Sequence, residues 1–508
     1  MLSDTEQAVG VSLRNLWPRA QFFGASDVRT TSCCGDSRVA RPGYLFVAID
    51  GTRLDGHEFA EHAVARGATA VLAERALPLV GVPVCVVPDT RKSYGELCQA
   101  LAGQPSHKLK VIGVTGTNGK TTTSTLIASI LRAAGHRTGI LGTLGYDDSA
   151  EQQTASLTTP SPPALASWLA RMEANGCSHA VVEVSSHALA QNRIAGIDLT
   201  AACITNVRRD HLDYHGSLAN YRRAKERIFE YLVPDGIAVF NADDRVNAEL
   251  AGKLDFPALT IGLRSEADLT GTLLERYRSE QTFVLTAGGT SALVRTPMIG
   301  DAHIYNCLMA AAMGLALGID LQTVVRGIEQ VRHVAGRLER IECGQPFGVF
   351  VDYAHTPDAL TASLTTLRDV TPGRVICVFG AGGNRDTQKR PLMGRAVELG
   401  ADLAIITSDN PRDEHPATIA EQILSGFSEP AAAELVQDRA AAIGRALSLA
   451  EDGDTARIAG RGHETHQVIG RHSYEFDDRD VARSWLYNIE PADTSDWAGG
   501  SRMPVGNI

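Results

Sequence analysis

The sequence has no apolar run that approaches the roughly 18 residues of a membrane-spanning helix. Its first residues, MLSDTEQAVG, contain neither the basic segment nor the apolar segment of a secretory signal. A basic tail or basic repeat is also absent, and the formal net charge is −11. These features argue against membrane and nucleic-acid partners, and we expect a cytoplasmic protein. Because the chain is acidic overall, any phosphate group must bind at a small local site.

Closely spaced cysteines are also missing. The nine cysteines are scattered, and Cys33 and Cys34 are the one adjacent pair. No CxxC or Cys/His spacing of a zinc site occurs, and neighbouring cysteines are poorly placed to pair with each other. We therefore expect reduced, mostly buried thiols.

The chain is too long for one hydrophobic core. Its 508 residues correspond to about three domains of ordinary size. Short β-branched runs alternate with helical segments, which predicts an α/β protein. We divide it into a small N-terminal α/β domain (1–106), a central P-loop domain with a mainly parallel sheet (107–333) and a C-terminal Rossmann-like domain (334–508).

The most informative stretch is GVTGTNGKTTT at residues 113–123, between an apolar run and a helix-like segment. A glycine-rich turn there presents backbone N–H groups and a helix N-terminus to one point, which favours a polyphosphate. Lys120 would approach the outer phosphates, and the Thr121 hydroxyl would bind Mg²⁺. The strict P-loop pattern has glycine in place of Val114, and an ordinary glycine turn is the alternative. The predicted ATP-binding residues are Gly113, Val114, Thr115, Gly116, Thr117, Asn118, Gly119, Lys120, Thr121 and Thr122.

Polar residues follow two further strand-like runs, 179–184 and 200–205. Glu183 stands at the end of the first and His211 shortly after the second. Ligands of parallel sheets bind beyond the carboxyl ends of the strands, so both side chains are expected near Thr121. A carboxylate, an imidazole and a hydroxyl could form a Mg²⁺ site, although histidine is an unusual Mg²⁺ ligand. Each residue alone would more often be a satisfied polar group.

The third region repeats the alternation of strand and helix without a phosphate loop. Polar, turn-rich segments follow each of its strand-like runs, which we place at 348–351, 375–379, 403–407 and 456–459. The regularity predicts a second parallel sheet with its own ligand-binding edge.

Taken together, the motifs resemble the Mur ligase family over residues 30–490. They are GVTGTNGKTTT, the EVSSH from Glu183, the RDHLDYHG from Arg209, the GRLE from Gly336, the DYAHTPD from Asp352 and the GHE ending at Glu464. The resemblance implies domains for a UDP-sugar, for ATP and for an incoming amino acid. It implies an ATP-dependent ligase of cytoplasmic peptidoglycan precursor synthesis, with Mg²⁺ as cofactor. Its substrates would be UDP-N-acetylmuramoyl-L-alanyl-D-glutamate and meso-2,6-diaminopimelate, and we expect a monomer.

The resemblance also implies roles for individual residues. Lys225 matches a lysine that the family carries as a carbamate, an anion able to bind Mg²⁺; from the sequence alone, a solvated helix lysine is the alternative. The implied metal set is Thr121, Glu183, His211 and Lys225, which with Lys120 forms the catalytic group. The implied nucleotide contacts are Asn306, Arg337 and Asp352. The implied substrate contacts are Ser37, Thr52, Arg53, Leu54, Thr158, Thr159, Ser185, Gln191, Arg193, Arg390, Gly460 and Glu464.

The sequence Asp409-Asn410-Pro411-Arg412 is expected to select the amino acid. Diaminopimelate differs from lysine by a second carboxylate at its far end. Arginine can bind that carboxylate through two parallel hydrogen bonds, whereas lysine as a substrate would leave the guanidinium unpaired. In the family, DNPR is the pattern of the diaminopimelate enzymes. As an alternative, Asn-Pro after a strand is a common turn, but a turn does not require Arg412.

The expected chemistry is formation of an acyl phosphate on the D-glutamyl side-chain carboxylate, followed by attack of the diaminopimelate amine. Two alternatives stay open. A folylpolyglutamate synthase shares the P-loop and the carbamate lysine but lacks a UDP-sugar domain. A non-catalytic ATP-binding protein on the Mur fold would not need Lys120, Glu183, His211, Lys225 and Arg412 together.

Overall fold

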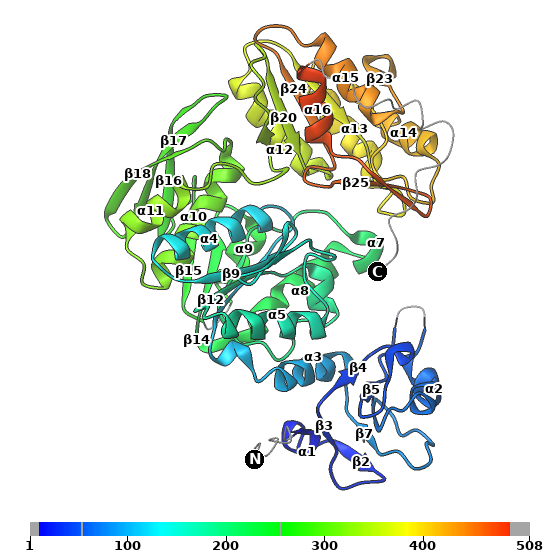
Figure 1. Ribbon diagram of the computed structural model, residues 1–508. Helices are drawn as coiled ribbons and strands as arrows, with labels where there is room; N and C mark the ends of the chain where they lie inside the picture. The colour runs from blue at the N-terminus through cyan, green and yellow to red at the C-terminus, as the bar shows by residue number, and fades with distance from the viewer. Residues whose placement is uncertain (1–9, 52–53, 254–255, 488–508) are drawn as a thin grey trace, which may run out of the picture. The chain divides into compact units, whose positions relative to one another are not determined.

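The structure is a computed structural model that describes residues 10–51, 54–253 and 256–487 (Figure 1). Its strands form three main sheets with helices between them, which confirms the α/β class. The chain forms two compact units. The first unit contains the residues up to 115 together with 135–203 and 224–238, and the second contains 116–134, 204–223 and the residues from 239 onward. The boundaries proposed for three domains stay a prediction.

The N-terminal part of the first unit is built on a sheet of order β2-β7-β6-β5-β4. Its middle strand β6 pairs in parallel with β5 and with β7. Leu45, Val47 and Leu72 pack in its core against Leu97 of α3. The elements are β1 (Val11–Ser12), α1 (Leu13–Leu16), β2 (Gln21–Phe23), β3 (Arg29–Thr30), β4 (Cys33–Cys34), η1 (Ser37–Val39), β5 (Leu45–Val47), η2 (Gly56–Phe59), α2 (Ala60–Ala65), β6 (Ala70–Ala73), β7 (Val84–Val86), α3 (Thr90–Leu101) and η3 (Pro105–His107).

The first unit also carries strands of the central sheet, in the order β11-β10-β9-β12-β8-β13-β14. Here β12 pairs in parallel with both β8 and β9, and its five residues are all buried. Such fully buried strands are typical of parallel sheets. The elements are β8 (Lys110–Thr115), β9 (Thr138–Gly142), β10 (Gly145–Asp147), β11 (Gln152–Gln153), α5 (Pro162–Ala174), β12 (His179–Glu183), α6 (Ser186–Ala190), β13 (Leu199–Ile204), α8 (Leu218–Glu226), η4 (Arg227–Tyr231) and β14 (Leu232–Asn241). Of these, β13, α8 and β14 belong partly to the second unit.

In the second unit, helix α4 follows the phosphate loop and packs against α10 and α11. Its apolar stripe includes Leu126, Ile127 and Ile130, and the Ser129 hydroxyl donates to the Gly327 carbonyl over 2.6 Å. Strands β16, β17 and β18 form an antiparallel meander. The elements are α4 (Lys120–Ala133), α7 (Leu212–His215), α9 (Arg245–Ala251), β15 (Ala258–Gly262), β16 (Leu269–Arg276), β17 (Gln281–Ala287), β18 (Thr290–Thr296), α10 (Asp301–Ala316) and α11 (Leu321–Glu329).

The C-terminal sheet has the order β19-β20-β24-β21-β22-β23 and is parallel except for β19. Alternate residues of β21 enter two different cores, Cys377 with Leu364 and Met393 on one face and Val378 with Ile443 on the other. This doubly wound arrangement confirms the Rossmann-like expectation. The elements are β19 (Glu339–Arg340), β20 (Gly348–Asp352), α12 (Pro357–Val370), β21 (Val375–Phe379), α13 (Lys389–Gly400), β22 (Leu403–Ile406), α14 (Pro416–Leu424), η5 (Pro430–Ala432), β23 (Ala433–Leu435), α15 (Arg439–Leu449), β24 (Thr455–Ala459), β25 (His466–Ile469), β26 (His472–Glu475) and α16 (Asp478–Leu486).

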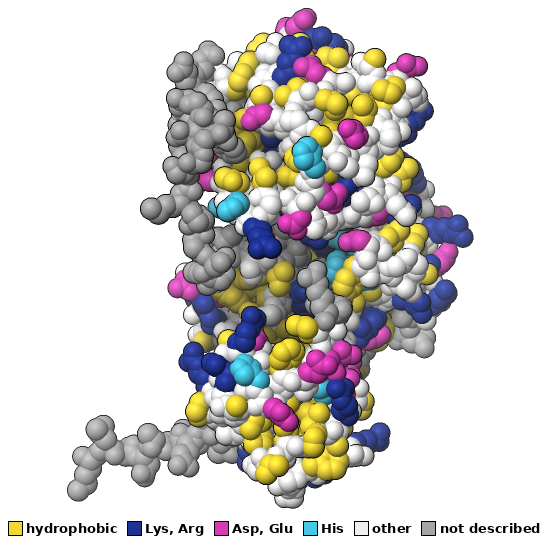
Figure 2. Space-filling model, turned by 90° about the vertical axis from the view of Figure 1, so that its right-hand side faces the viewer, with side chains coloured by type: hydrophobic (Ala, Val, Ile, Leu, Met, Phe, Trp, Pro, Cys, Tyr) yellow, Lys and Arg dark blue, Asp and Glu magenta, His cyan; other side chains and the backbone are white. Residues whose placement is uncertain are grey.

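Two expectations from composition can be compared with the structure. All nine cysteines are free thiols, and all except Cys33 and Cys343 are buried. In the part of the chain that the structure describes, no helix combines the length and apolarity needed to cross a membrane. Acidic and basic side chains are interspersed on the face shown in Figure 2.

Candidate active site

The backbone of the phosphate loop requires glycine at two positions. Gly116 has φ +149° and Gly119 has φ +84°, values that residues other than glycine rarely adopt. A Cβ on Gly116 would lie 1.8 Å from Thr205 Oγ1, and one on Gly119 would lie 2.4 Å from Asn306 Oδ1. The loop therefore fits tightly against its neighbours before α4 begins at Lys120.

Hydrogen bonds tie this loop to the segment after β13. The backbone N–H of Thr117 donates to the Asn206 carbonyl over 2.9 Å, and that of Asn118 donates to Asn206 Oδ1 over 3.0 Å. The Lys120 ammonium donates to the carbonyls of Gly116 and Thr117 over 2.9 and 3.0 Å. The lysine thus lies along the loop that is expected to hold the phosphates.

The predicted nucleotide contacts Asn306 and Arg337 lie beside the start of α4. Arg337 Nη2 donates to the Thr121 hydroxyl over 3.2 Å, and Asn306 Oδ1 accepts from the Thr123 hydroxyl over 3.2 Å. The Arg337 guanidinium is stacked on the ring of Tyr353, with Cζ 4.3 Å from the ring centroid. The structure therefore brings the GRLE and DYAHTPD motifs together with the phosphate loop.

Asp352, expected on the ribose, is held by protein groups. Its Oδ2 accepts from Nη2 of the fully buried Arg457 over 2.9 Å, and its Oδ1 accepts from the Leu338 N–H over 3.2 Å. Asp352 is followed directly by Tyr353, on which Arg337 is stacked. Its contact with a nucleotide stays a prediction.

Two of the four predicted metal ligands belong to the first unit, and both are buried. Glu183 ends β12, is 1 % exposed and accepts from the Thr143 N–H and hydroxyl over 3.0 Å each. Lys225 on α8 is also 1 % exposed. The alternative of a solvated Lys225 is therefore wrong. Burial of an ammonium is costly, and a carbamate would replace it by an anion able to bind a cation.

Thr121 and His211, the other two predicted ligands, belong to the second unit. His211 precedes α7, has φ +52°, and places Nε2 3.5 Å from Asp210 Oδ2. Among residues 10–51, 54–253 and 256–487, no group of three or more His, Cys, Asp and Glu side chains could hold a metal. The predicted set contains two residues of those types, and its convergence stays a prediction.

Asp210 is a functional candidate that the sequence reasoning missed. Its side chain is 7 % exposed, and its carboxylate lies 3.8 Å from His355 Nε2 and 3.7 Å from Lys389 Nζ. Burial by itself raises the pKa of Asp210, but the nearby His355 imidazole and the charge of Lys389 outweigh it and hold that pKa well below its usual value. The signal in the sequence that could have identified Asp210 was its position directly before His211, a predicted metal ligand.

Four of the residues expected to hold the sugar–dipeptide substrate form one connected group in the first unit. Thr159 donates to the Glu183 carbonyl over 2.8 Å and accepts from the Ser185 N–H over 2.9 Å. Arg193 donates to the Thr159 carbonyl over 3.0 Å and to Gln191 Oε1 over 2.8 and 3.0 Å. This group adjoins Glu183 through Thr159, and its contact with a substrate stays a prediction.

The remaining members of the substrate set are more dispersed. The Thr158 and Thr143 hydroxyls are 3.2 Å apart, which also places Thr158 near Glu183. Ser37 is buried with its hydroxyl 3.0 Å from His62 Nδ1, whereas Leu54 is exposed. Thr52 and Arg53 lie outside the described residues.

Arg412 lies in a constrained loop after β22. Its φ is +53°, and its N–H donates to the Val468 carbonyl over 3.1 Å. One guanidinium nitrogen, Nη1, donates to the Gly383 carbonyl over 2.8 Å. Burial lowers the pKa of Arg412, and the charge of Arg385 adds to this effect. A partly desolvated guanidinium held in this way is suited to bind a carboxylate.

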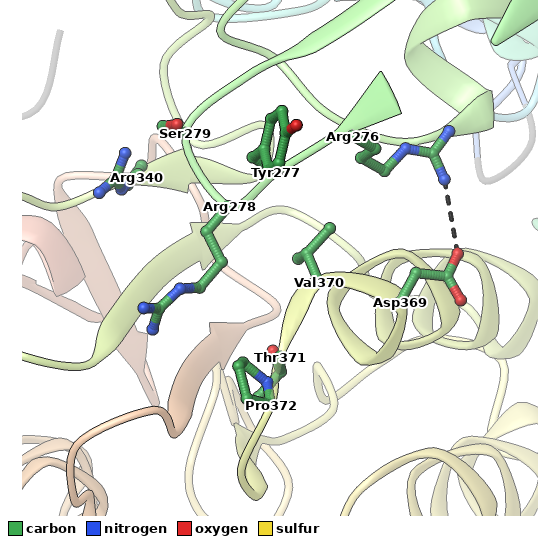
Figure 3. A pocket seen from close by; sticks show the side chains of 9 residues that line it. All are labelled: Arg276, Tyr277, Arg278, Ser279, Arg340, Asp369, Val370, Thr371 and Pro372. Atoms are coloured by element: carbon green, nitrogen blue, oxygen red, sulfur yellow. Dashed lines mark hydrogen bonds and ion pairs between the residues drawn. The ribbon is translucent and has the colours of Figure 1, made fainter. Parts of the chain in front are cut away.

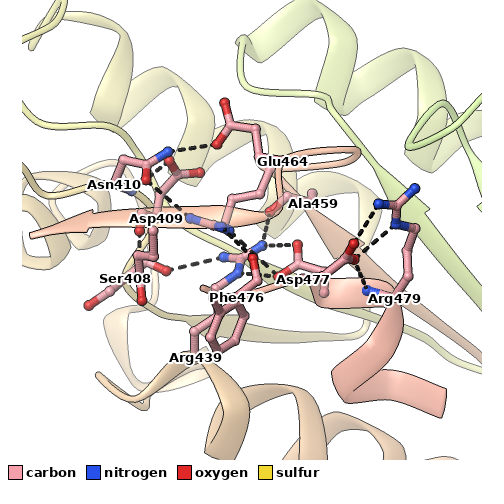
Figure 4. Close-up of polar contacts among 12 residues, drawn as sticks. Ser408, Asp409, Asn410, Arg439, Ala459, Glu464, Phe476, Asp477 and Arg479 are labelled. Carbon is pink, nitrogen blue, oxygen red and sulfur yellow. Dashed lines mark hydrogen bonds and ion pairs between the residues drawn. The ribbon is translucent and has the colours of Figure 1, made fainter. Parts of the chain in front are cut away.

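Asp409 and Asn410 precede Arg412 in the same loop, and Glu464 lies beside them (Figure 4). Asn410 Nδ2 donates to Glu464 Oε2 over 2.7 Å. Burial raises the pKa of Glu464, and the neighbouring charge of Asp409 raises it further. Gly460 has φ +114°, and a Cβ there would lie 2.4 Å from Asp409 Oδ2. The structure thus brings four predicted residues together, and Pro411 lies in the same loop.

Arg390 is fully buried and contacts protein groups. Its Nη1 donates to Glu414 Oε2 over 2.7 Å and to Gln422 Oε1 over 2.6 Å, and its Nη2 donates to the Gly382 carbonyl over 3.0 Å. The side chain therefore holds the loop after β21. Its contact with a substrate stays a prediction.

A cavity of about 530 Å³ lies elsewhere in the second unit (Figure 3). Arg276 closes one side of it through an ion pair of 3.4 Å with Asp369, and Arg278 and Arg340 also line it. None of the site residues expected from the sequence lines this cavity.

Comparison with known proteins gives consistent matches along the chain. Three family models match: the Mur ligase family catalytic domain at residues 31–101, the Mur ligase middle domain at 114–314 and the Mur ligase glutamate ligase domain at 336–462. The UDP-N-acetylmuramoyl-L-alanyl-D-glutamate--2,6-diaminopimelate ligase of Geobacillus kaustophilus (strain HTA426) is 42 % identical over 456 residues, which are 88 % of this chain and 93 % of that protein.

Solved structures agree with these matches. A solved UDP-N-acetylmuramoyl-L-alanyl-D-glutamate--2,6-diaminopimelate ligase superposes with a TM-score of 0.67 at 33 % identity, covering 94 % of this chain and 99 % of that one. The Mycobacterium tuberculosis folylpolyglutamate synthase complexed with ADP and AMPPCP has a TM-score of 0.60 at 21 % identity. It covers 73 % of this chain and 92 % of its own length, and this likeness shows the fold alone.

Proposed function

The chain belongs to the Mur ligase family, and from this premise we propose that it is an ATP-dependent ligase of peptidoglycan precursor synthesis. It joins meso-2,6-diaminopimelate to the D-glutamate side chain of UDP-N-acetylmuramoyl-L-alanyl-D-glutamate. The similarity over 88 % of the chain to a relative named for this reaction carries the proposal. A cytoplasmic location, where ATP and UDP-linked sugars are available, and a monomeric state are parts of the same proposal.

The phosphate loop binds ATP in this proposal. The backbone at Gly116 and Gly119 leaves no room for side chains, and Lys120 lies along the loop where it can meet the outer phosphates. Arg337 and Asn306 flank the start of α4. Lys120 and Arg337 would neutralise charge as the γ-phosphoryl group moves to the D-glutamyl carboxylate, so that catalysis is mainly positioning and electrostatics.

Thr121, Glu183, His211 and a carbamylated Lys225 would hold Mg²⁺, which supplies charge neutralisation at the transferred phosphate. The buried environments of Glu183 and Lys225 support this donor set. A matched pair of measurements tests the carbamate. After incubation with ¹³C-bicarbonate, the wild type should show a carbamate carbon resonance that Lys225→Arg lacks. Its absence from the wild type would remove Lys225 from the metal set.

The loop of Asp409, Asn410 and Arg412 would bind the incoming amino acid. Arg412 takes the far carboxylate of diaminopimelate, and Asn410 with Glu464 takes the polar groups at its other end. After the acyl phosphate has formed, the free amine attacks its carbonyl carbon, the tetrahedral intermediate collapses, and phosphate leaves. Gln191 and Arg193, next to Thr159, would help hold the dipeptide substrate.

Phosphate release from ATP, measured with the UDP-muramoyl dipeptide and either meso-diaminopimelate or L-lysine, tests the function. Release with diaminopimelate alone is expected. Release with lysine instead would keep the ligase and discard Arg412 as selector. Release with neither amino acid would favour the folate-type or the non-catalytic alternative. The family match at residues 31–101 supports the Mur ligase over the folate-type alternative only.

A further inference from the structure

We call residues 409–412 the amino-acid loop. A cluster of three fully buried charged residues lies next to this loop, outside the set of residues expected to touch substrate. Arg439 is the first residue of α15, Asp478 is the first residue of α16, and Arg461 follows β24. The side chains of all three have 0 % exposure. We call these residues the buried charge cluster. Because buried charges are costly unless they are paired, their contacts indicate what the cluster holds.

Arg439 joins the ends of two strands. It forms a double hydrogen bond with Asp478, with Nε to Oδ1 and Nη2 to Oδ2 both at 2.7 Å. The same guanidinium donates to the Ser408 carbonyl over 3.2 Å and to the Ala459 carbonyl over 2.9 Å (Figure 4). Ser408 directly precedes the Asp409 loop, and Ala459 directly precedes Gly460. Arg439 therefore fixes the distance between the two segments that carry the amino-acid site.

Arg461 fixes the orientation of the Asn410 amide. Its Nη1 donates to Asn410 Oδ1 over 3.1 Å, and the Val468 N–H donates to the same oxygen over 2.8 Å. With two donors on its oxygen, the amide must direct Nδ2 to the other side, where it meets Glu464. The second arm of Arg461 donates to the Phe476 carbonyl over 2.9 Å, and its Nε lies 3.8 Å from Asp478 Oδ1.

We propose that the buried charge cluster of Arg439, Asp478 and Arg461 positions the amino-acid loop and thereby sets the affinity for the incoming amino acid. None of the three is a catalytic residue. They act through Asn410, Glu464 and the chain on either side of Gly460. The inference rests on the proposed function, since it concerns the amino-acid site of that ligase.

Arg461→Lys is the sharpest test. Lysine keeps the charge but cannot donate to Asn410 and to the Phe476 carbonyl with one fork. We expect the KM for diaminopimelate to rise about tenfold, with the KM values for ATP and the UDP-muramoyl dipeptide changed less than about twofold. Arg439→Lys should act in the same way, because a lysine could donate to only one of the Ser408 and Ala459 carbonyls. It is the second variant if Arg461→Lys does not fold.

Arg374→Lys is the matched control. Arg374 also forms two hydrogen bonds with an aspartate, Asp454, but at the opposite edge of the same sheet, before β21 and β24 begin. It should lower the melting temperature without changing any KM. The proposal is overturned if Arg461→Lys and Arg439→Lys only lose stability as Arg374→Lys does, or raise all three KM values equally. A wild type inactive with both amino acids overturns the proposed function and this inference together.

Discussion

The phosphate loop and the amino-acid loop both follow strands of α/β sheets, yet different forces hold them. The phosphate loop is defined by its backbone, since Gly116 and Gly119 adopt positive φ and lie against Thr205 and Asn306. The amino-acid loop is held by side chains, among them the buried charge cluster and Asn410. The phosphate loop is therefore one continuous stretch whose path depends on its own glycines, whereas the network around the amino-acid loop joins segments up to 70 residues apart in the chain.

This difference predicts different responses to mutation. A backbone-defined site should tolerate changes around it but not within its glycines and its lysine. A site held by a network should lose its precision when a distant member changes, because each charged group is partner to several others. Substitutions in the two loops should therefore separate the ATP parameters from the amino-acid parameters.

The largest effect is expected for Lys120→Ala. The ammonium lies along the phosphate loop, and its charge is expected to stabilise the transferred phosphoryl group. We expect kcat to fall by about 1,000-fold or more, with a melting temperature within about 2 °C of wild type. Lys108→Ala removes an exposed lysine paired with Glu173 and should leave kcat unchanged. Substantial ligation by Lys120→Ala would refute the assigned role.

A smaller but more selective effect is expected for Arg412→Ala. Loss of a charge-assisted double hydrogen bond to the far carboxylate should raise the KM for diaminopimelate by about 30- to 100-fold, and the KM for ATP should not change. The preference of the enzyme for diaminopimelate over L-lysine should largely disappear. Arg385→Ala is the control, because it removes a neighbouring charge on an exposed side chain without removing the arginine fork. An unchanged preference in Arg412→Ala would place the selector elsewhere.

Two glycine substitutions compare the loops directly. In Gly119→Ala the new Cβ would meet Asn306, and in Gly460→Ala it would meet Asp409, each at 2.4 Å. We expect Gly119→Ala to raise the KM for ATP and Gly460→Ala to raise the KM for the amino acid, each by about tenfold.

Gly135→Ala separates backbone strain from steric clash in this test. Gly135 has the same φ as Gly119, +84°, but nothing lies within 4 Å of its Cβ position. It should lose about 1–2 kcal/mol of folding free energy, with all KM values unchanged. If Gly119→Ala and Gly460→Ala both raise the KM for the same substrate, the two loops do not serve separate substrates.

Local patterns predicted the backbone-defined part of the molecule well. Strand β8, the glycine turn and helix α4 follow one another in sequence, so hydrophobic pattern and turn chemistry suffice to place them. The four strands expected in the C-terminal sheet are present as β20, β21, β22 and β24. The amino-acid loop follows β22 as expected, and its Asn410 contacts Glu464.

Side-chain networks were much less accessible from the sequence. Arg439 and Asp478 stand 39 positions apart, and each resembles an ordinary charged residue at a helix start. Asp210 was passed over although its neighbour His211 was selected. Lys225 resembled a solvated helix lysine because its neighbours are arginines, whereas its burial depends on how α8 packs. Burial and pairing of charge depend on tertiary contacts that no local pattern records.

The smallest expected effect is on the pH dependence of stability, and it has opposite signs at Asp210 and Glu464. Folding lowers the pKa of Asp210, so the stability it contributes is present above its unfolded-state pKa and is lost as pH falls toward the folded-state value. Folding raises the pKa of Glu464, so its contribution is present below the unfolded-state pKa and is lost as pH rises through the folded-state value.

Urea unfolding of Asp210→Asn and Glu464→Gln between about pH 3 and pH 7 measures both contributions. Asp210→Asn should flatten the loss of stability toward acid pH, because the amide cannot take up the proton that the unfolded aspartate binds more tightly. Glu464→Gln should instead remove a loss that develops as pH rises, because the buried carboxylate beside Asp409 no longer ionises. If both variants change the slope with the same sign, burial beside Asp409 does not raise the pKa of Glu464 on folding.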